Sequence, residues 1–348
     1  MVDLRSDTLT MPTEGMRTAM AGAELGDDVF GEDPTVNRLQ RRAAELLGKE
    51  DALFVASGTM GNLLGILSLS RSGDEIIADA ESHVFLNEGA GAAALAGVQI
   101  RQVATEAGIM TADQVRGALR PLHDVHQPPT TAVCVENTHN RAGGVVWPLD
   151  ALRAVSETAR RSGLSTHMDG ARLFNAAIAL DVPATEIAAT ADTVTFCVSK
   201  GLGAPVGSVL CGPTEVIRRA RRWRKALGGG WREAGMLAAA GLWALDHSIE
   251  RLADDHRNAR TLAEGLAEIE GVRLDLDRVQ TNIVYFELEG MDAQDFLARC
   301  REQEVLGAAG PDGRIRFVTH LGVDAGGVQR ALEVCSQALE SAWADSRA

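Results

Sequence analysis

Several groups of polar residues, each placed directly after a short apolar run, carry side chains suited to one kind of chemistry. Ser57-Gly58-Thr59 opens a helical pattern, where backbone N–H groups and hydroxyls could bind a phosphate or simply cap a helix. Asp169 could hold a protonated ring nitrogen or cap the next helix, and Lys200 could form a Schiff base or extend into solvent. Each residue alone is ambiguous. Together, an amine, a carboxylate and an anion-binding turn meet the requirements of pyridoxal 5'-phosphate, so the sequence predicts a site for this cofactor.

The elements that must position these residues are short strand-like runs that alternate with helical patterns from about residue 50 to 212. Residues 34–47 show how a helix is encoded, because Asp33 can cap it, Pro34 suits its first turn and Gly48 can end it. The alternation predicts a mainly parallel seven-stranded sheet flanked by helices, in which ligands bind beyond the carboxyl ends of the strands. The expected strands are residues 52–56, 75–78, 98–103, 132–136, 165–168, 193–198 and 207–211.

The last third of the sequence follows a different pattern. Its expected elements are a long helical stretch at 232–269, strands at 282–288 and 314–319, and helices at 293–302 and 326–342. This order is typical of a smaller α+β domain. We therefore expect residues 1–246 to form an N-terminal segment and a large α/β domain, and residues 247–348 to form a small C-terminal α+β domain.

Composition disfavours several classes of function. The formal net charge is −14, which argues against binding to nucleic acids and to anionic membranes. The basic run from Arg218 to Lys225 is an exception, and we interpret it as a solvated helix face or a contact between subunits. No apolar stretch has the length of a membrane span, and the first residues lack a signal-peptide pattern. The five cysteines are scattered without a Cys-x-x-Cys pair, so we expect a cytoplasmic location.

Two other binding chemistries are weaker hypotheses. His123-x-x-His126 and Glu136-x-x-His139 have the spacing of metal ligands, but no Cys/His cage accompanies them, so we predict no metal site. The stretch from Gly201 to Gly207 has a glycine spacing that resembles a dinucleotide-binding loop. Such a loop must open a helix, whereas a strand-like run follows here, which argues against that interpretation.

Beyond these single residues, an ordered series of stretches resembles the low-specificity L-threonine aldolases, a family of fold-type I pyridoxal-phosphate enzymes. The matching stretches are Asp3–Thr8, Gly26–Pro34, Ser57–Met60, Glu136–Asn140, His167–Arg172, Ser199–Ser208, Gly228–Gly230 with Arg232, and Arg316–His320. They follow one another from residue 3 to about 320, which makes the resemblance specific. It implies an aspartate-aminotransferase-like fold and a homo-oligomer, a dimer of dimers, whose subunits share their active sites.

The resemblance also implies a role for each matching residue. The implied catalytic residues are the Schiff-base lysine Lys200, the ring-nitrogen partner Asp169, and His83 and His126 as candidates for the base. The implied cofactor-binding residues are Gly58, Thr59, Asn62, His83, Asp169, Arg172, Lys200 and, from a neighbouring subunit, Arg232. The residues implied to bind the substrate are Ser6, Arg172, Arg316 and Lys225.

The implied reaction cleaves small β-hydroxy-α-amino acids. L-Threonine or L-allo-threonine would yield glycine and acetaldehyde by way of an external aldimine and a quinonoid. Phe30 stands where the family often has tyrosine, and Asn87 lies near a common aromatic position, so we expect both to affect side-chain preference. Transamination, elimination or racemisation on the same cofactor stays open at this point, since Lys200 and Asp169 would serve these reactions equally. A purely binding protein also stays open.

Overall fold

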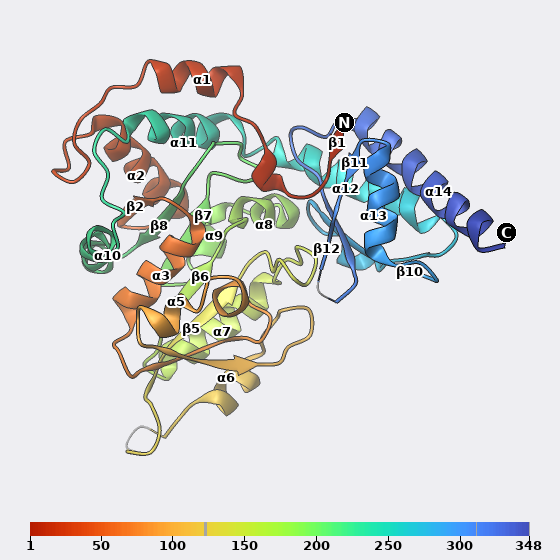
Figure 1. Ribbon diagram of the computed structural model, residues 1–348. Helices are drawn as coiled ribbons and strands as arrows, with labels where there is room; N and C mark the ends of the chain where they lie inside the picture. The colour runs from red at the N-terminus through yellow and green to blue at the C-terminus, as the bar shows by residue number, and fades with distance from the viewer. Residues whose placement is uncertain (122–123, 311, 348) are drawn as a thin grey trace.

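A seven-stranded sheet forms the centre of the larger part of the protein (Figure 1). The computed structural model describes residues 1–121, 124–310 and 312–347, with side chains up to residue 341, so His123 lies outside these ranges. The strands lie in the order β2-β8-β7-β6-β5-β3-β4, and β8 alone among them runs antiparallel to its neighbours. They are β2 (Asp51–Val55), β3 (Glu75–Asp79), β4 (Gln99–Val103), β5 (Thr130–Glu136), β6 (Ser165–Asp169), β7 (Thr193–Cys197) and β8 (Ser208–Gly212).

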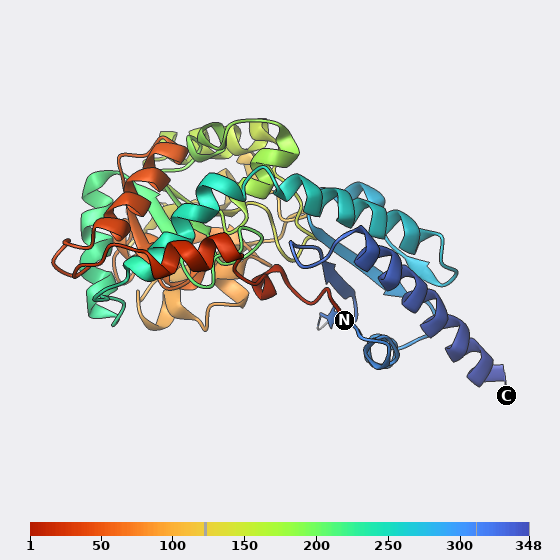
Figure 2. The same ribbon diagram turned by 90° about the horizontal axis from the view of Figure 1, so that it is seen from above.

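Helices cover both faces of this sheet (Figure 2). They are α1 (Glu14–Ala21), α2 (Pro34–Leu47), α3 (Gly58–Leu69), α4 (His83–Leu86), α5 (Gly91–Ala94), α6 (Ala112–Ala118), α7 (Leu149–Arg161), α8 (Leu173–Leu180), α9 (Ala184–Ala188), α10 (Thr214–Ala226) and α11 (Gly235–His247). Strand side chains alternate between the two faces, so that Phe54 joins the core beneath α2, α7 and α11, while Leu53 and Val55 join the core beneath α3 and α10. None of the helices in the described ranges combines the length and apolarity that a membrane crossing needs.

The local signals in the sequence predicted these elements closely. Each of the seven expected strands lies within two residues of its observed bounds. The helix predicted at 34–47 has those bounds, with Asp33 Oδ1 accepting from the backbone N–H groups of Thr35 and Val36 and with Gly48 left-handed at φ 61°. Caps and apolar periodicity are local properties, which is why one sequence suffices to predict them.

A second hydrophobic core lies under the C-terminal sheet. This four-stranded sheet has the order β12-β13-β10-β9. Its strands are β9 (Val272–Arg273), β10 (Ile283–Leu288), β12 (Ala308–Ala309) and β13 (Ile315–Val318). The other elements of this part are the helices α12 (Leu252–Ala267), α13 (Ala293–Glu302) and α14 (Ala325–Arg347) and the short strand β11 (Val305–Leu306). The single helical stretch expected at 232–269 is two helices, α11 and α12, separated by residues 248–251. Within α12, Leu252 packs in the first core, whereas Ala259 and Leu262 pack in the second. The domain boundary at 246/247 stays a prediction.

The N-terminal segment contacts both cores. Its strand β1 (Val2–Asp3) pairs in parallel with β11, and Leu4 is fully buried in the second core. Met16 of α1 is fully buried in the first core. Between them, a short 3-10 turn at Asp7–Leu9 passes the region where the two cores meet (Figure 1).

Candidate active site

Three of the predicted site residues follow strands that run parallel to one another. His83 begins α4 a few residues after β3, Asp169 is the last residue of β6, and Lys200 lies in the loop after β7. Since the carboxyl ends of parallel strands meet along one edge of a sheet, these residues lie where ligands bind in this class of fold.

Asp169 belongs to a buried network centred on Asn62. The Asn62 amide donates one hydrogen bond to Asp169 Oδ2 and one to Glu88 Oε1, each over 2.8 Å. The Asn62 carbonyl oxygen lies 3.1 Å from Nε2 of His167. Burial lowers the pKa of His167 to about 4, so the neutral ring must carry its single N–H on Nε2 to donate to that oxygen. The network therefore fixes Asp169 and Glu88 as acceptors.

The hydrogen bonds of Asn62 differ from the phosphate contact that the sequence predicted for it. We expected this residue to help hold a phosphate at the start of α3. Instead, both of its amide hydrogens are used by the two carboxylates, and its side chain is almost fully buried. These contacts make Asn62 a support for Asp169. They also place one N–H donor of Asn62 against each of the two carboxylates.

His83 joins the same network through Glu88. Its Nδ1 lies 2.8 Å from Glu88 Oε1, and its backbone N–H donates to Glu136 Oε2 over 2.6 Å. Burial alone would lower the pKa of His83, but the hydrogen bond to Glu88 and the charges of the surrounding carboxylates outweigh it and raise this pKa. One ring nitrogen of His83 and one carboxylate oxygen each of Glu88 and Asp169 lie within 4.8 Å of one another. Such an imidazole can exchange a proton near neutral pH.

The predicted phosphate turn is the N-terminus of α3. Ser57 caps the helix, because its Oγ accepts from the Met60 backbone N–H over 3.2 Å. Among the described residues, the N–H groups of Gly58 and Thr59 have no acceptor, as expected for the first turn of a helix. A Cβ at Gly58 would lie 3.0 Å from Cys197 Sγ, so glycine lets the turn pack against β7. The turn thus offers unpaired donors for an anion.

Lys200 lies near a buried ion pair. Arg172 donates from Nε and Nη2 to the two oxygens of Asp7, over 2.7 and 2.6 Å. Burial opposes the ionised form of Asp7, but Arg172 and the charge of Lys200 outweigh it and hold the pKa of this carboxyl well below its ordinary value. The Lys200 side chain is half-buried, and its amine has no hydrogen bond or ion pair within the described ranges. The amine is therefore available for reaction.

The arginines predicted to bind a carboxylate converge on Asn140. Nη1 of Arg172 and Nη1 of Arg316 both donate to Asn140 Oδ1, over 3.3 and 3.4 Å. Arg316 also donates from Nη2 to the backbone carbonyl of Arg5 over 3.0 Å. Ser6, the next residue, caps the turn at Asp7–Leu9 with its hydroxyl. Two guanidinium groups from distant parts of the sequence thus meet at one acceptor, an arrangement that suits a substrate carboxylate.

Three predicted residues lie apart from this cluster in the single chain. The His126 side chain is 86% exposed, and among the described residues its ring hydrogen-bonds to Asp124 alone. Arg232 is exposed and pairs with Asp27 over 2.8 Å. Lys225 is exposed in the last turn of α10. The roles of these three residues stay predictions.

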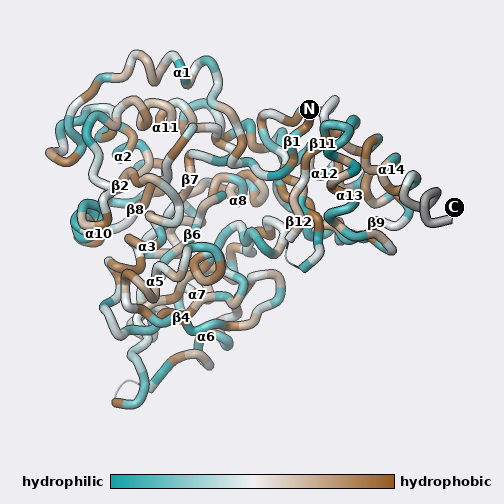
Figure 3. Tube along the Cα trace, in the orientation of Figure 1, coloured by the Kyte–Doolittle hydropathy of each residue, from teal (hydrophilic) through white to brown (hydrophobic). Residues whose placement is uncertain are grey.

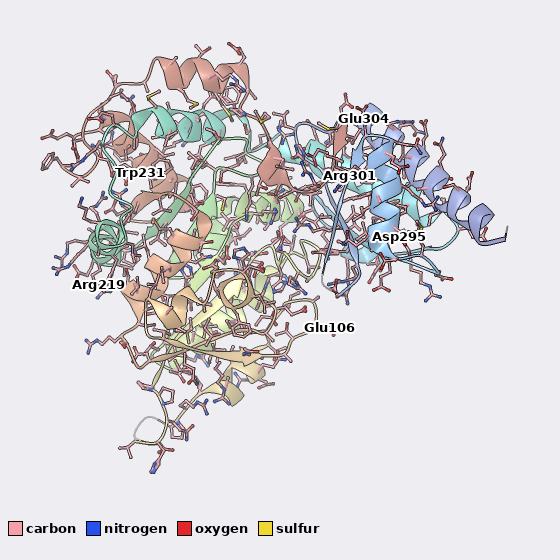
Figure 4. All side chains as sticks on the ribbon, in the orientation of Figure 1. Glu106, Arg219, Trp231, Asp295, Arg301 and Glu304 are labelled. Atoms are coloured by element: carbon pink, nitrogen blue, oxygen red, sulfur yellow. The ribbon has the colours of Figure 1, made fainter. Side chains whose placement is uncertain are left out.

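Other positions noted in the sequence also lie at the surface. Phe30 is 73% exposed, and Asn87 is exposed directly after α4. The basic run forms the hydrophilic helix α10 (Figure 3), with Arg219 at the outer edge of the molecule (Figure 4). Within α10, Arg224 is buried and pairs with Asp28.

Comparisons with known proteins identify the family. The family model described as beta-eliminating lyase matches residues 3–289. The chain is 46% identical over 325 residues to a probable low-specificity L-threonine aldolase 2 of Arabidopsis thaliana, with 92% of each protein covered. It is 43% identical to the low specificity L-threonine aldolase of Escherichia coli K12, over 93% of this chain and 95% of that one. The chain belongs to the low-specificity L-threonine aldolase family.

Solved structures of similar proteins agree with this assignment at the level of the fold. A threonine aldolase of Leishmania major superposes with a TM-score of 0.84 at 22% identity, covering 97% of this chain and 99% of that one. A Sphingomonas wittichii serine palmitoyltransferase superposes with a TM-score of 0.78 at 19% identity, covering 97% and 87%. The predicted fold of fold-type I enzymes is thereby confirmed. Membership of the threonine aldolase family confirms the predicted enzyme class, a lyase.

Two residues of the site had no role in the sequence analysis. Glu88 lies in a turn five positions after His83, and nothing in its spacing marks it as functional. Asp7 lies within a stretch that resembles the threonine aldolase family, but its partner Arg172 is 165 positions away. Only the folded structure brings such pairs together.

Proposed function

We propose that the protein cleaves β-hydroxy-α-amino acids, with L-threonine and L-allo-threonine as the first substrates to test, into glycine and an aldehyde. The proposed cofactor is pyridoxal 5'-phosphate. The observation that carries this proposal is the position of Asp169, a buried carboxylate held by Asn62 at a strand end, beside the imidazole of His83. Relatives of the same family are named threonine aldolases, which supports the choice of substrate.

The residues present fit this cofactor. Asp169 and Glu88 are two buried carboxylates close together, with His83 as the titratable base beside them. A protonated ring nitrogen at Asp169 would supply the positive charge that such a buried group requires. The unpaired N–H groups at residues 58–59 would hold the phosphate, and Lys200 would bind the aldehyde carbon. When bound, this cofactor supplies an electron-withdrawing ring for cleavage at Cα.

The remaining residues would orient the substrate and move its proton. Arg316 and Arg172, which meet at Asn140, would hold the carboxylate and so fix the torsion about Cα. Arg172 is itself held rigid by the buried Asp7. Nε2 of His83 would accept the proton of the β-hydroxyl, which must leave before the aldehyde can form.

We further propose that the protein works as a homo-oligomer, a dimer of dimers, in the cytoplasm. Arg232 and Lys225 are exposed and apart from the buried network, which supports their acting on the active site of a neighbouring subunit. The five cysteines are free and buried, as suits a reducing compartment. Sedimentation of fully active monomers would contradict the shared active site.

Replacement of lysines provides the direct test. Lys200→Ala should abolish formation of glycine and aldehyde from L-threonine, L-allo-threonine and L-phenylserine supplied without a keto acid. Lys49→Ala is the matched control, because Lys49 is also partly buried but donates to the Ala191 carbonyl. Borohydride should trap the cofactor on the peptide that contains Lys200 and on neither other lysine peptide. A 2-oxo acid as the product would instead support transamination or elimination.

A further inference from the structure

Glu88 is held inside the protein by a tight turn. The helix α4 ends at Leu86, and the chain then turns back through Gly89 and Ala90, which have positive φ values of 59° and 57°. Glu88 is only 8% exposed as a result. A buried carboxylate is costly unless it is well hydrogen-bonded, so its contacts need a structural or catalytic reason.

The hydrogen bonds around Glu88 have a defined direction. His167 donates to the Asn62 oxygen, so the Asn62 amide must point its N–H groups toward Glu88 and Asp169. Glu88 Oε1 therefore already accepts a hydrogen bond from Asn62. The hydrogen between Oε1 and His83 Nδ1, which are 2.8 Å apart, then comes from the imidazole. Nε2 of His83 has no partner within the described ranges.

We propose that Glu88 is a positioning residue that keeps the proton of neutral His83 on Nδ1 and so leaves Nε2 as the proton acceptor of the reaction. This inference rests on the proposed aldol cleavage, which requires a base for the β-hydroxyl. It distinguishes between the two histidines by their surroundings. His126 also has a carboxylate, Asp124, at its Nδ1, but the His126 side chain lies at the surface, whereas Glu88 holds His83 from the interior. The arrangement follows the general rule that a carboxylate on one ring nitrogen orients the other for chemistry.

Charge supports the same role. The groups that act on the pKa of His83 are Glu88, Asp169 and Glu136, all carboxylates, and together they raise it against the effect of burial. Burial and the charge of Asp169 raise the pKa of Glu88, opposed by its hydrogen bonds from His83 and Asn62. Cys134 contributes no charge, since burial raises its pKa to about 12. A proton accepted at Nε2 would place a cation directly against Glu88, which stabilises the imidazolium form.

The proton position can be measured without any assay of activity. We would record ¹⁵N spectra of histidine-labelled holoenzyme above the pKa of His83 and assign its signals by their loss in His83→Asn. Wild type should show a protonated Nδ1 and a bare Nε2. In Glu88→Gln the amide can donate to Nδ1, so the population should move toward the Nε2–H form. A wild-type ring protonated on Nε2, or a tautomer unchanged in Glu88→Gln, would overturn the proposal.

Kinetics provide a second readout. Removing the Glu88 carboxylate takes away a charge that raises the pKa of His83, so in Glu88→Gln the acidic limb of kcat/KM should move to lower pH. The plateau should fall by about 100-fold or more, since a general base is lost in part. Glu88→Asp should recover part of the rate, and the exposed Glu106→Gln (Figure 4) should match wild type. A lower plateau with an unmoved limb would mean a merely structural role.

The two proposals fail in different ways. If wild type cleaves L-threonine but Glu88→Gln keeps both its rate and its pH profile, the role of Glu88 is wrong and the proposed function stands. If wild type releases no aldehyde from any of the three substrates, the proposed function is wrong, whatever the spectra of His83 show.

Discussion

At the scale of single residues, the site depends on charges that are paired away from water. Asp7 and Arg172 are both almost fully buried and joined by two short hydrogen bonds. Such a pair contributes little net stability, because both ions lose their hydration, but removing one partner leaves an uncompensated charge in the interior. The pair therefore serves to hold the Arg172 guanidinium in place beside Asn140.

Asp7→Asn should show this asymmetry. The substitution leaves Arg172 buried with a neutral partner, so we expect the free energy of unfolding to fall by about 3–5 kcal/mol. Glu186→Gln is the control, since its ion pair with Arg153 is exposed and should be worth about 1 kcal/mol or less. Urea denaturation of both variants at neutral pH measures the difference. Equal losses in the two variants would show that burial of the pair does not matter.

At the scale of elements, the sequence predicts the helices and strands that local patterns specify and misses the features that depend on contacts between distant residues. The alternation of apolar residues and the caps at Asp33 and Gly48 predicted the strands and α2 within two residues. The break between α11 and α12 was not predicted, because residues 248–251 contain neither the glycine nor the proline that usually marks the end of a helix. Glu88 was missed for a similar reason, since only its burial next to His83 gives it a role.

The helix α3 offers a prediction at this scale. It carries the predicted phosphate turn and packs so closely on β7 that a Cβ at Gly61 would lie 2.5 Å from Thr195 Cγ2. Gly61→Ala should therefore push α3 away from the sheet, lower the free energy of unfolding by about 1–3 kcal/mol and weaken cofactor binding. Gly117→Ala in α6 meets no atom within 4 Å, and we expect it to stabilise by about 0.5–1 kcal/mol. Thermal unfolding and cofactor titration of both variants test the contrast.

At the scale of the whole molecule, the N-terminal segment joins the two cores next to the site. Leu4 donates its backbone N–H to the Leu306 carbonyl and accepts from Val318, each over 2.8 Å. The backbone carbonyl of the next residue, Arg5, accepts a hydrogen bond from Nη2 of Arg316. The position of a predicted substrate-binding arginine thus depends on a strand formed by the first residues of the protein.

Leu4→Ala should disturb stability and substrate binding together. We expect the free energy of unfolding to fall by about 2–5 kcal/mol, since Leu4 is fully buried. The KM for threonine should rise, because the carbonyl that holds Arg316 would lose its anchor. Leu9→Ala, at a side chain that is 39% exposed, should change stability by about 0.5 kcal/mol or less. An unchanged KM in a folded Leu4→Ala protein would separate the segment from the site.

The pairing of β1 with β11 also constrains how this protein comes to be made. Residues 2 and 3 pair with residues 305 and 306, so during synthesis β1 must stay unpaired until β11 has been made. Until then the apolar side chains of this segment are exposed to solvent, and the hydrogen bond between Arg316 and the Arg5 carbonyl cannot form. We therefore expect the affinity for the amino-acid substrate to appear late and abruptly during synthesis. Truncated nascent chains that end before residue 305 should lack this affinity.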